Sequence, residues 1–143
     1  MKGFSMTTIL LLLATAVLWG SSPILEKVGL GKTDPLIAVS IRSFAITIIL
    51  LLFLTFTGRI KDLFVIDTKS LVIFIISGFL AGFLGMWTYF GALKLGATSK
   101  IVPIAATYPL ITAILSIIIL KEGVTLFRVI GTILIIAGVW FVR

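Results

Sequence analysis

The chain has 143 residues, of which 60% are apolar and only 12% are charged, and its mean hydropathy is +1.32. This composition excludes an ordinary soluble globule, because a protein of this size needs more polar residues to cover its exterior. Cysteine and histidine are absent, which excludes disulfides, thiol chemistry and zinc sites built from those ligands. We therefore expect an all-α membrane protein with no metal ion and no cofactor, and not an enzyme.

The net charge of +7 does not indicate a nucleic-acid partner. The basic residues are scattered over the ends of apolar segments, whereas a nucleic-acid site gathers them on one face. Headgroups of anionic lipids are the expected counter-charge. The lipid bilayer is the first partner that the composition predicts.

Five apolar segments follow one another along the chain, and we interpret each as a transmembrane helix. The first begins like a signal peptide, with Lys2 before an apolar run and small residues at 14–16, but the run continues through Trp19. Pro35 suits the first turn of the second helix. The fifth segment is the shortest and should cross nearly upright or thin the bilayer locally. The predicted helices cover residues 8–25, 36–56, 71–93, 101–120 and 127–142.

No linker divides these segments, and the longest connection, residues 57–70, is too short for a folded domain. Residues 1–143 are therefore expected to form one domain of five transmembrane helices. The expected location is the plasma membrane of a prokaryotic cell, or an inner membrane, with several passes.

Lysine and arginine are distributed almost evenly between the two sides of the membrane. The side of the amino end carries Lys2, Arg59, Lys61, Lys69, Lys121 and Arg128, and the other side carries Lys27, Lys32, Lys94, Lys100 and Arg143. Cytoplasmic connections usually carry more Lys and Arg than those on the opposite side. Because the two sides differ so little here, two alternatives remain for the orientation of the chain. In one, the connection with Arg59, Lys61 and Lys69 fixes the amino end in the cytoplasm. In the other, the chain inserts both ways and pairs as an antiparallel homodimer, which supplies the inverted repeat of many transporters.

Small residues recur on one face of the third segment, and two glycines lie two turns apart in the fifth. Helix backbones approach closely where glycine replaces a larger side chain. Packing within the bundle and a specific dimer contact both fit this pattern. The residues predicted to pack are Gly78, Gly82 and Gly85 in the third segment and Gly131 and Gly138 in the fifth.

Two polar stripes, each beside a proline, run along the first and fourth segments. One contains Trp19 and Glu26, and the other contains Tyr108 and Thr112. An interior cavity shared by the stripes is one interpretation, and an interfacial tryptophan with kinks that only shape the bundle is the other. Proline removes a backbone donor and frees a carbonyl one turn earlier. The predicted helix breaks are Pro23, Pro103 and Pro109.

Arg42 is charged although it lies inside the second apolar segment. It is roughly 9 Å from the start of that segment, at about 1.5 Å per residue. A charge at this depth needs an ionic partner, a water-filled space or a side chain that reaches the headgroups. Glu26 and Lys27 end the first segment on the same side of the membrane, so a Glu26–Arg42 ion pair is geometrically allowed.

Glu26 is the only carboxylate that borders the membrane interior, since Asp34, Asp62, Asp67 and Glu122 lie in connections. Positive charge beside it favours its ionised form, which argues against a proton carrier. We therefore expect substrate exchange or facilitated movement, with Arg42 attracting anionic or zwitterionic substrates. The predicted cavity residues are Trp19, Glu26, Arg42, Tyr89, Tyr108 and Thr112.

Short motifs spread over nearly the whole chain keep a common order and spacing. They are Leu18-Trp19-Gly20-Ser21-Ser22 with Lys27, Arg42-Ser43-Phe44, Tyr89 to Ala97, Tyr108-Pro109, Lys121 to Thr125, and Gly131 to Gly138. In these motifs the chain resembles the EamA-like domain of the drug/metabolite transporter superfamily. The resemblance implies a five-helix half of an inverted-repeat transporter bundle, which usually occurs as two tandem halves in one chain. Because this sequence has one half, it implies a homodimer or a heteromeric partner.

We expect a secondary transporter or exporter of small metabolites or amphipathic compounds that works by alternating access between paired five-helix units. No nucleotide-binding motif is present, so ATP hydrolysis is not expected. The alternative is a non-catalytic subunit of a heteromeric transporter or lipid-carrier flippase, whose partner supplies the site. The expected partners are a small-molecule substrate and either a second copy, parallel or antiparallel, or a second small membrane protein.

Overall fold

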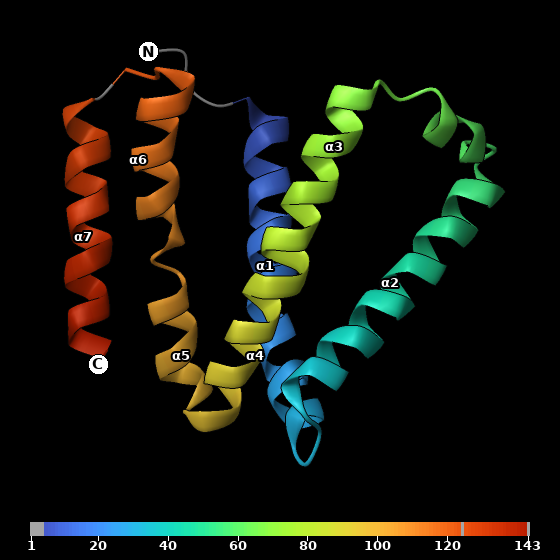
Figure 1. Cartoon of the computed structure of the whole chain (residues 1–143). Coiled ribbons are helices and arrows are strands. Elements are labelled where there is room, and N and C mark those ends of the chain that lie inside the picture. Colours follow the sequence, from blue (N-terminus) through green and yellow to red (C-terminus); the bar gives the residue numbers. More distant parts are fainter. Residues whose placement is uncertain (1–4, 124, 143) are drawn as a thin grey trace. The chain divides into compact units, whose positions relative to one another are not determined.

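Every regular element is helical in residues 5–123 and 125–142, the part of the chain that the computed structural model describes (Figure 1). The elements are α1 (Met6–Leu30), α2 (Pro35–Phe56), η1 (Ile60–Phe64), α3 (Thr68–Ser77), η2 (Gly78–Gly85), α4 (Met86–Leu95), α5 (Thr98–Ala105), α6 (Tyr108–Leu120) and α7 (Leu126–Val142). The prediction of an all-α protein is confirmed. Lys2, Arg143 and the side chain of Arg128, which enter the charge distribution, lie outside the described residues.

Contacts divide the chain into two units, Met1–Lys94 and Leu95–Arg143. The first unit holds α1, α2, η1, α3, η2 and α4 up to Lys94, and α1 packs against α2 within it. The second unit holds α5, α6 and α7, with α5 packed against α7. The charged pair predicted from the sequence belongs wholly to the first unit.

Polar side chains start the three long helical stretches of the first unit. Ser5, Asp34 and Asp67 accept hydrogen bonds from backbone N–H groups at 3.1, 2.8 and 2.9 Å, respectively. Such caps satisfy donors that the first helical turn leaves without a partner. Pro35 lies in the first turn of α2, as predicted.

The third apolar stretch, Thr68–Leu95, has 28 residues and is longer than predicted. It is also not α-helical throughout, because η2 is a π-helix between α3 and α4. A Cβ atom built on Gly85 would lie 3.1 Å from the carbonyl oxygen of Leu80, so glycine suits this wide turn. The hydropathy pattern that predicted the segment does not distinguish an α turn from a π turn.

The fourth apolar stretch, Thr98–Leu120, is interrupted at residues 106–107, between α5 and α6. Pro103 lies inside α5, and Pro109 lies in the first turn of α6. Pro109 has no N–H with which to bond the carbonyl one turn earlier, which explains a gap at this place. In contrast, α1 runs through Pro23 and ends only at Leu30.

Four helical stretches of the described chain are long and apolar enough to cross a membrane: Met6–Leu30, Pro35–Phe56, Thr68–Leu95 and Thr98–Leu120. The fifth predicted helix corresponds to α7, which is apolar but has only 17 residues. A helix needs about 20 residues to cross the hydrocarbon core without tilt or adjustment. The fold therefore contains four candidate spans and a shorter apolar helix.

The most deeply buried hydrophobic side chains of the described residues are Leu30, Val39, Phe90 and Leu93. They come from the carboxyl end of α1, the amino end of α2 and the carboxyl end of α4, which lie together at the bottom of Figure 1. Most other apolar side chains are exposed, as expected of surfaces that lipid covers. The core of the first unit is thus concentrated at one end of its helices.

Candidate functional site

Glu26 on α1 and Arg42 on α2 form an ion pair. The Arg42 Nε atom lies 3.8 Å from Glu26 Oε1, and the two side chains are 39% and 11% exposed, respectively. The ion pair allowed by the sequence is therefore present. Its position inside two candidate membrane spans makes it a candidate functional group, because charge is costly there.

Ser22 positions the carboxylate of Glu26. Its Oγ atom donates a hydrogen bond to Glu26 Oε1 at 2.8 Å, from one turn earlier on α1. Arg42 therefore approaches the same oxygen that Ser22 already occupies. Within the described chain, Glu26 Oε2 and the terminal amino groups of Arg42 have no further hydrogen bond or ion pair. The pair has both acceptor and donor capacity left for a ligand.

A pocket of about 320 Å³ opens beside this pair. Besides Glu26 and Arg42, its lining is mostly apolar and comes from α1, α2, the turn between them and α4. A few polar groups in an apolar wall are typical of small-molecule sites, and the volume is at the lower end for such sites. The lining includes Leu25, Leu30, Thr33, Ala38, Ile41 and Phe90.

Two lysines fix the end of this pocket. Lys27 Nζ donates to the carbonyl oxygens of Leu93 and Lys94 at 2.6 and 3.4 Å. In return, Lys94 Nζ donates to the carbonyl oxygen of Thr33 at 2.8 Å. A lysine near a helix carboxyl end can satisfy its last carbonyls and the dipole. This arrangement is not predicted from the sequence, although Lys27 and Lys94 both lie in the last turns of their helices.

The other predicted cavity residues are not all brought together. Trp19 is exposed on α1 and does not line the pocket. Tyr89 is half-buried on α4 and does not line the pocket. Tyr108 and Thr112 belong to the second unit, where the Thr112 hydroxyl donates to the Tyr108 carbonyl oxygen at 3.3 Å. Their participation in the cavity stays a prediction.

Four of the five glycines predicted to pack have open space beside them. A Cβ atom built on Gly78, Gly82, Gly131 or Gly138 would meet nothing within 4 Å, apart from the helix's own nearby backbone. Only Gly85 is crowded, and its neighbour is the Leu80 carbonyl oxygen of its own helix. At these four glycines the described chain therefore leaves room for a side chain.

Apolar spans with an ion pair in a pocket between two of them define a multi-pass membrane protein with a candidate solute site. The chain belongs to the EamA-like transporter family, whose sequence profile matches residues 6–143. The family resemblance drawn from the sequence motifs is therefore confirmed.

Two relatives are similar over nearly the whole of this chain. An uncharacterized protein of Methanocaldococcus jannaschii is 36% identical over 136 residues, which is 93% of each chain. An uncharacterized transporter of Archaeoglobus fulgidus is 28% identical over 137 residues, which is 96% of this chain but 48% of that transporter. The chain thus spans about half the length of the second relative. No solved structure matches it significantly.

Proposed function

We propose that the chain is a secondary transporter or exporter of small metabolites or amphipathic compounds in the plasma membrane. Two five-helix copies pair and work by alternating access, with α7 as the short fifth span. Membership of a transporter family supports the activity. The match to about half of the Archaeoglobus transporter supports a pair of copies, because a second copy would complete a similar length.

The single observation that carries this proposal is the Glu26–Arg42 pair in an otherwise apolar pocket. Ion pairs inside an apolar protein are weak sources of stability, since desolvation offsets much of their attraction. A pair with unused donors and an unused oxygen is better suited to ligand binding. An anionic group can bind Arg42, and a zwitterion can also place its positive group at Glu26 Oε2.

Substrate exchange fits this geometry better than proton coupling does. The Arg42 guanidinium at 3.8 Å and the Ser22 hydroxyl at 2.8 Å both contact Glu26 Oε1, so this carboxylate is already engaged before a substrate binds. The substrate itself would therefore replace part of the ion pair as it binds and leave the pair restored after release.

Transport by the purified chain in proteoliposomes tests the proposal. Anionic and zwitterionic amphiphiles are supplied as labelled substrates, with and without an imposed pH gradient. Exchange without a gradient is expected. Uphill accumulation that requires the gradient and disappears in Glu26→Gln would overturn the exchange mechanism, and the absence of transport for every substrate would count against the homodimer.

The alternative is a non-catalytic subunit of a heteromeric transporter or lipid-carrier flippase. The half-length match to the Archaeoglobus transporter favours it equally, since a different half-length partner would also complete the assembly. Purification from its native membrane distinguishes the two. Constant recovery of a second small membrane protein, which restores transport that the chain alone lacks, would support the alternative.

A further inference from the structure

The connection between α2 and α3 exposes an apolar run where a soluble loop would be polar. Leu63, Phe64, Val65 and Ile66 follow one another, and Phe64 and Val65 are 85% and 83% exposed. Phe56, at the end of α2, is 87% exposed. Exposed apolar residues that gather in one place mark a surface that binds lipid or protein.

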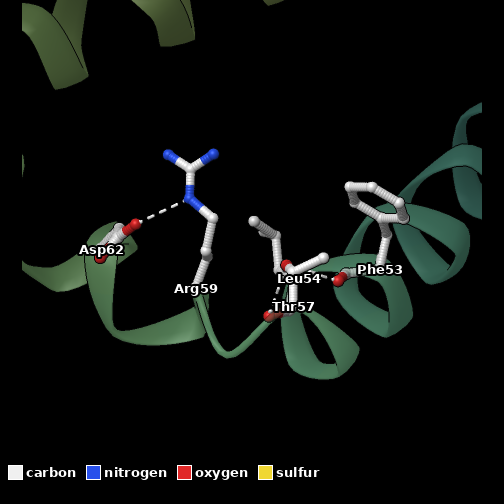
Figure 2. Close-up of polar contacts among 5 residues, drawn as sticks. All are labelled: Phe53, Leu54, Thr57, Arg59 and Asp62. Atoms are coloured by element: carbon white, nitrogen blue, oxygen red, sulfur yellow. Dashed lines mark hydrogen bonds and ion pairs between the residues drawn. The ribbon is translucent and has the colours of Figure 1, made fainter.

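Both acidic residues of this connection are already engaged. The Nε atom of Arg59 donates to Asp62 Oδ2 at 3.0 Å (Figure 2). Asp67 Oδ1 accepts the N–H of Ser70 at the start of α3, at 2.9 Å. The side chains of Lys61 and Lys69 are exposed and have no hydrogen bond or ion pair within residues 5–123 and 125–142. Residues 57–69 carry three basic and two acidic side chains, so the connection is net positive.

The chain turns immediately after α2, which keeps the connection at the membrane surface. Thr57 Oγ1 donates to the carbonyl oxygens of Phe53 and Leu54 at 2.8 and 3.3 Å (Figure 2). The N–H of Arg59 donates to Leu54 O at 2.8 Å. Gly58 has φ of 70°, a left-handed conformation that glycine adopts without strain. Because α2 and α3 are both parts of candidate spans, their two ends hold residues 57–67 beside the headgroups.

We propose that residues 57–69 form a membrane-surface anchor. Leu63, Phe64, Val65 and Ile66 enter the boundary between headgroups and acyl chains, and Lys61 and Lys69 contact phosphates of anionic lipids. Apolar residues flanked by lysine are typical of segments that lie in the interface, and basic residues beside a span attract anionic headgroups. The occupant is the lipid surface and not a protein, because both flanking spans already bring this segment to the bilayer.

Spin labelling tests the apolar part of the anchor, since the chain has no native cysteine. Phe64→Cys is labelled in the full chain, in vesicles that contain phosphatidylglycerol, and compared with Lys32→Cys in the turn between α1 and α2. The label at 64 should collide several times more often with oxygen than with a water-soluble nickel chelate, and the label at 32 should show the reverse. Equal water access at both sites would overturn the anchor. Protection of position 64 from both reagents would indicate a protein contact and would also overturn it.

The charged part is tested with spin-labelled lipids. The preference of the chain for phosphatidylglycerol over phosphatidylcholine should fall severalfold in Lys61→Gln/Lys69→Gln. The charge-preserving pair Lys61→Arg/Lys69→Arg should keep it. An unchanged preference in the Gln pair would show that these lysines do not contact anionic lipids.

Discussion

The ammonium group of Lys27 lies 2.6 Å from the carbonyl oxygen of Leu93, a residue 66 positions further along the chain. This bond joins the end of α1 to the end of α4, beside the buried side chains of Leu30 and Leu93. Lys94 completes the arrangement by bonding Thr33 in the turn that follows α1. The candidate pocket is therefore held at one end by main-chain contacts that do not depend on a substrate.

Replacing Lys27 should destabilise the first unit. Lys27→Met keeps the long apolar stem but leaves the carbonyl oxygens at the end of α4 without this donor. A hydrogen bond to a charged group contributes about 2 kcal/mol, so the free energy of unfolding in mixed detergent should fall by about that amount. Lys32→Met is the matched control, because Lys32 is exposed and makes no such bond in the described chain. Equal losses in both variants would contradict a specific role for Lys27.

Alanine substitutions at two glycines should differ in effect. Alanine is favoured over glycine in a helix by about 1 kcal/mol, and Gly82→Ala has room to gain part of this stabilisation. In Gly85→Ala the new methyl group lies 3.1 Å from the Leu80 carbonyl oxygen, and this crowding should cancel the gain. The free energy of unfolding should therefore be higher for Gly82→Ala than for Gly85→Ala. The opposite order would show that the wide turn does not require glycine.

Acid should weaken the start of α3. Hydrogen bonds from the side chain and the backbone N–H of Ser70 hold the pKa of Asp67 below its usual value of 3.8. A carboxyl whose pKa is lower in the folded state stabilises that state above its unfolded pKa, and this contribution is lost as the pH falls through the folded pKa. Thermal unfolding of the chain should therefore shift downward with acid below about pH 4. Asp67→Asn should show a smaller shift over the same range, and an identical shift would exclude Asp67 as a source of it.

Arg42 should be essential for transport and dispensable for insertion. Arg42→Ala should reduce exchange in proteoliposomes to background while the protein is still recovered from the membrane as before. Arg42→Lys should restore only part of the activity, because the planar group with several donors is lost. Arg59→Ala is the control, since Arg59 is exposed and pairs with Asp62 outside the spans. If Glu26 acts together with Arg42, the combined change with Glu26→Gln should be less harmful than the sum of the single changes.

Reporter fusions distinguish the two alternatives for orientation, and the alternative of dual insertion predicts the following results. Reporters fused after Arg143 should give signal on both sides of the membrane, because the difference in Lys and Arg between the sides is small. Two or three lysines added at the same place should lock one orientation and abolish transport by the homodimer. An oppositely locked copy should restore it. Signal on one side only would exclude dual insertion.

The ion pair could be predicted from the sequence because the chain offers so few candidates. Of the five carboxylates, Glu26 alone lies inside a candidate span, and Arg42 is a charge at similar depth in the next segment. Hydropathy likewise located the long helices, since a bilayer requires continuous apolar runs. Pro109 indicated the gap in the fourth stretch, although the apolar run by itself predicts one continuous helix over residues 101–120.

The contact of Lys27 could not be predicted in the same way. A lysine at a helix end can reach the lipid headgroups, or it can donate to a carbonyl oxygen that is distant in the sequence. Which of the two it binds depends on tertiary packing, which the sequence pattern does not give. The pocket walls were missed for a related reason, because Phe90 and Leu30 look like any other apolar residue of a span. The spacing of the glycines in η2 is compatible with close packing of two helices and also with a π-helix. It therefore did not indicate which of the two this stretch forms.

The π-helical stretch at Gly78–Gly85 also changes how the third span should be drawn. A helical wheel assumes about 100° per residue, and residues in a π turn advance by a smaller angle. The angular positions of the α4 residues are therefore shifted relative to those of α3. Two residues that coincide on a single helical wheel for the whole span need not lie on the same face. Three aromatic rings follow one another along this stretch at steps of four residues: Phe79, Phe83 and Trp87. The centroids of successive rings lie 5.7 and 6.0 Å apart, so this row of rings continues through the π-helical stretch into α4. When family sequences are compared for inward-facing positions in this span, α3 and α4 need separate wheels.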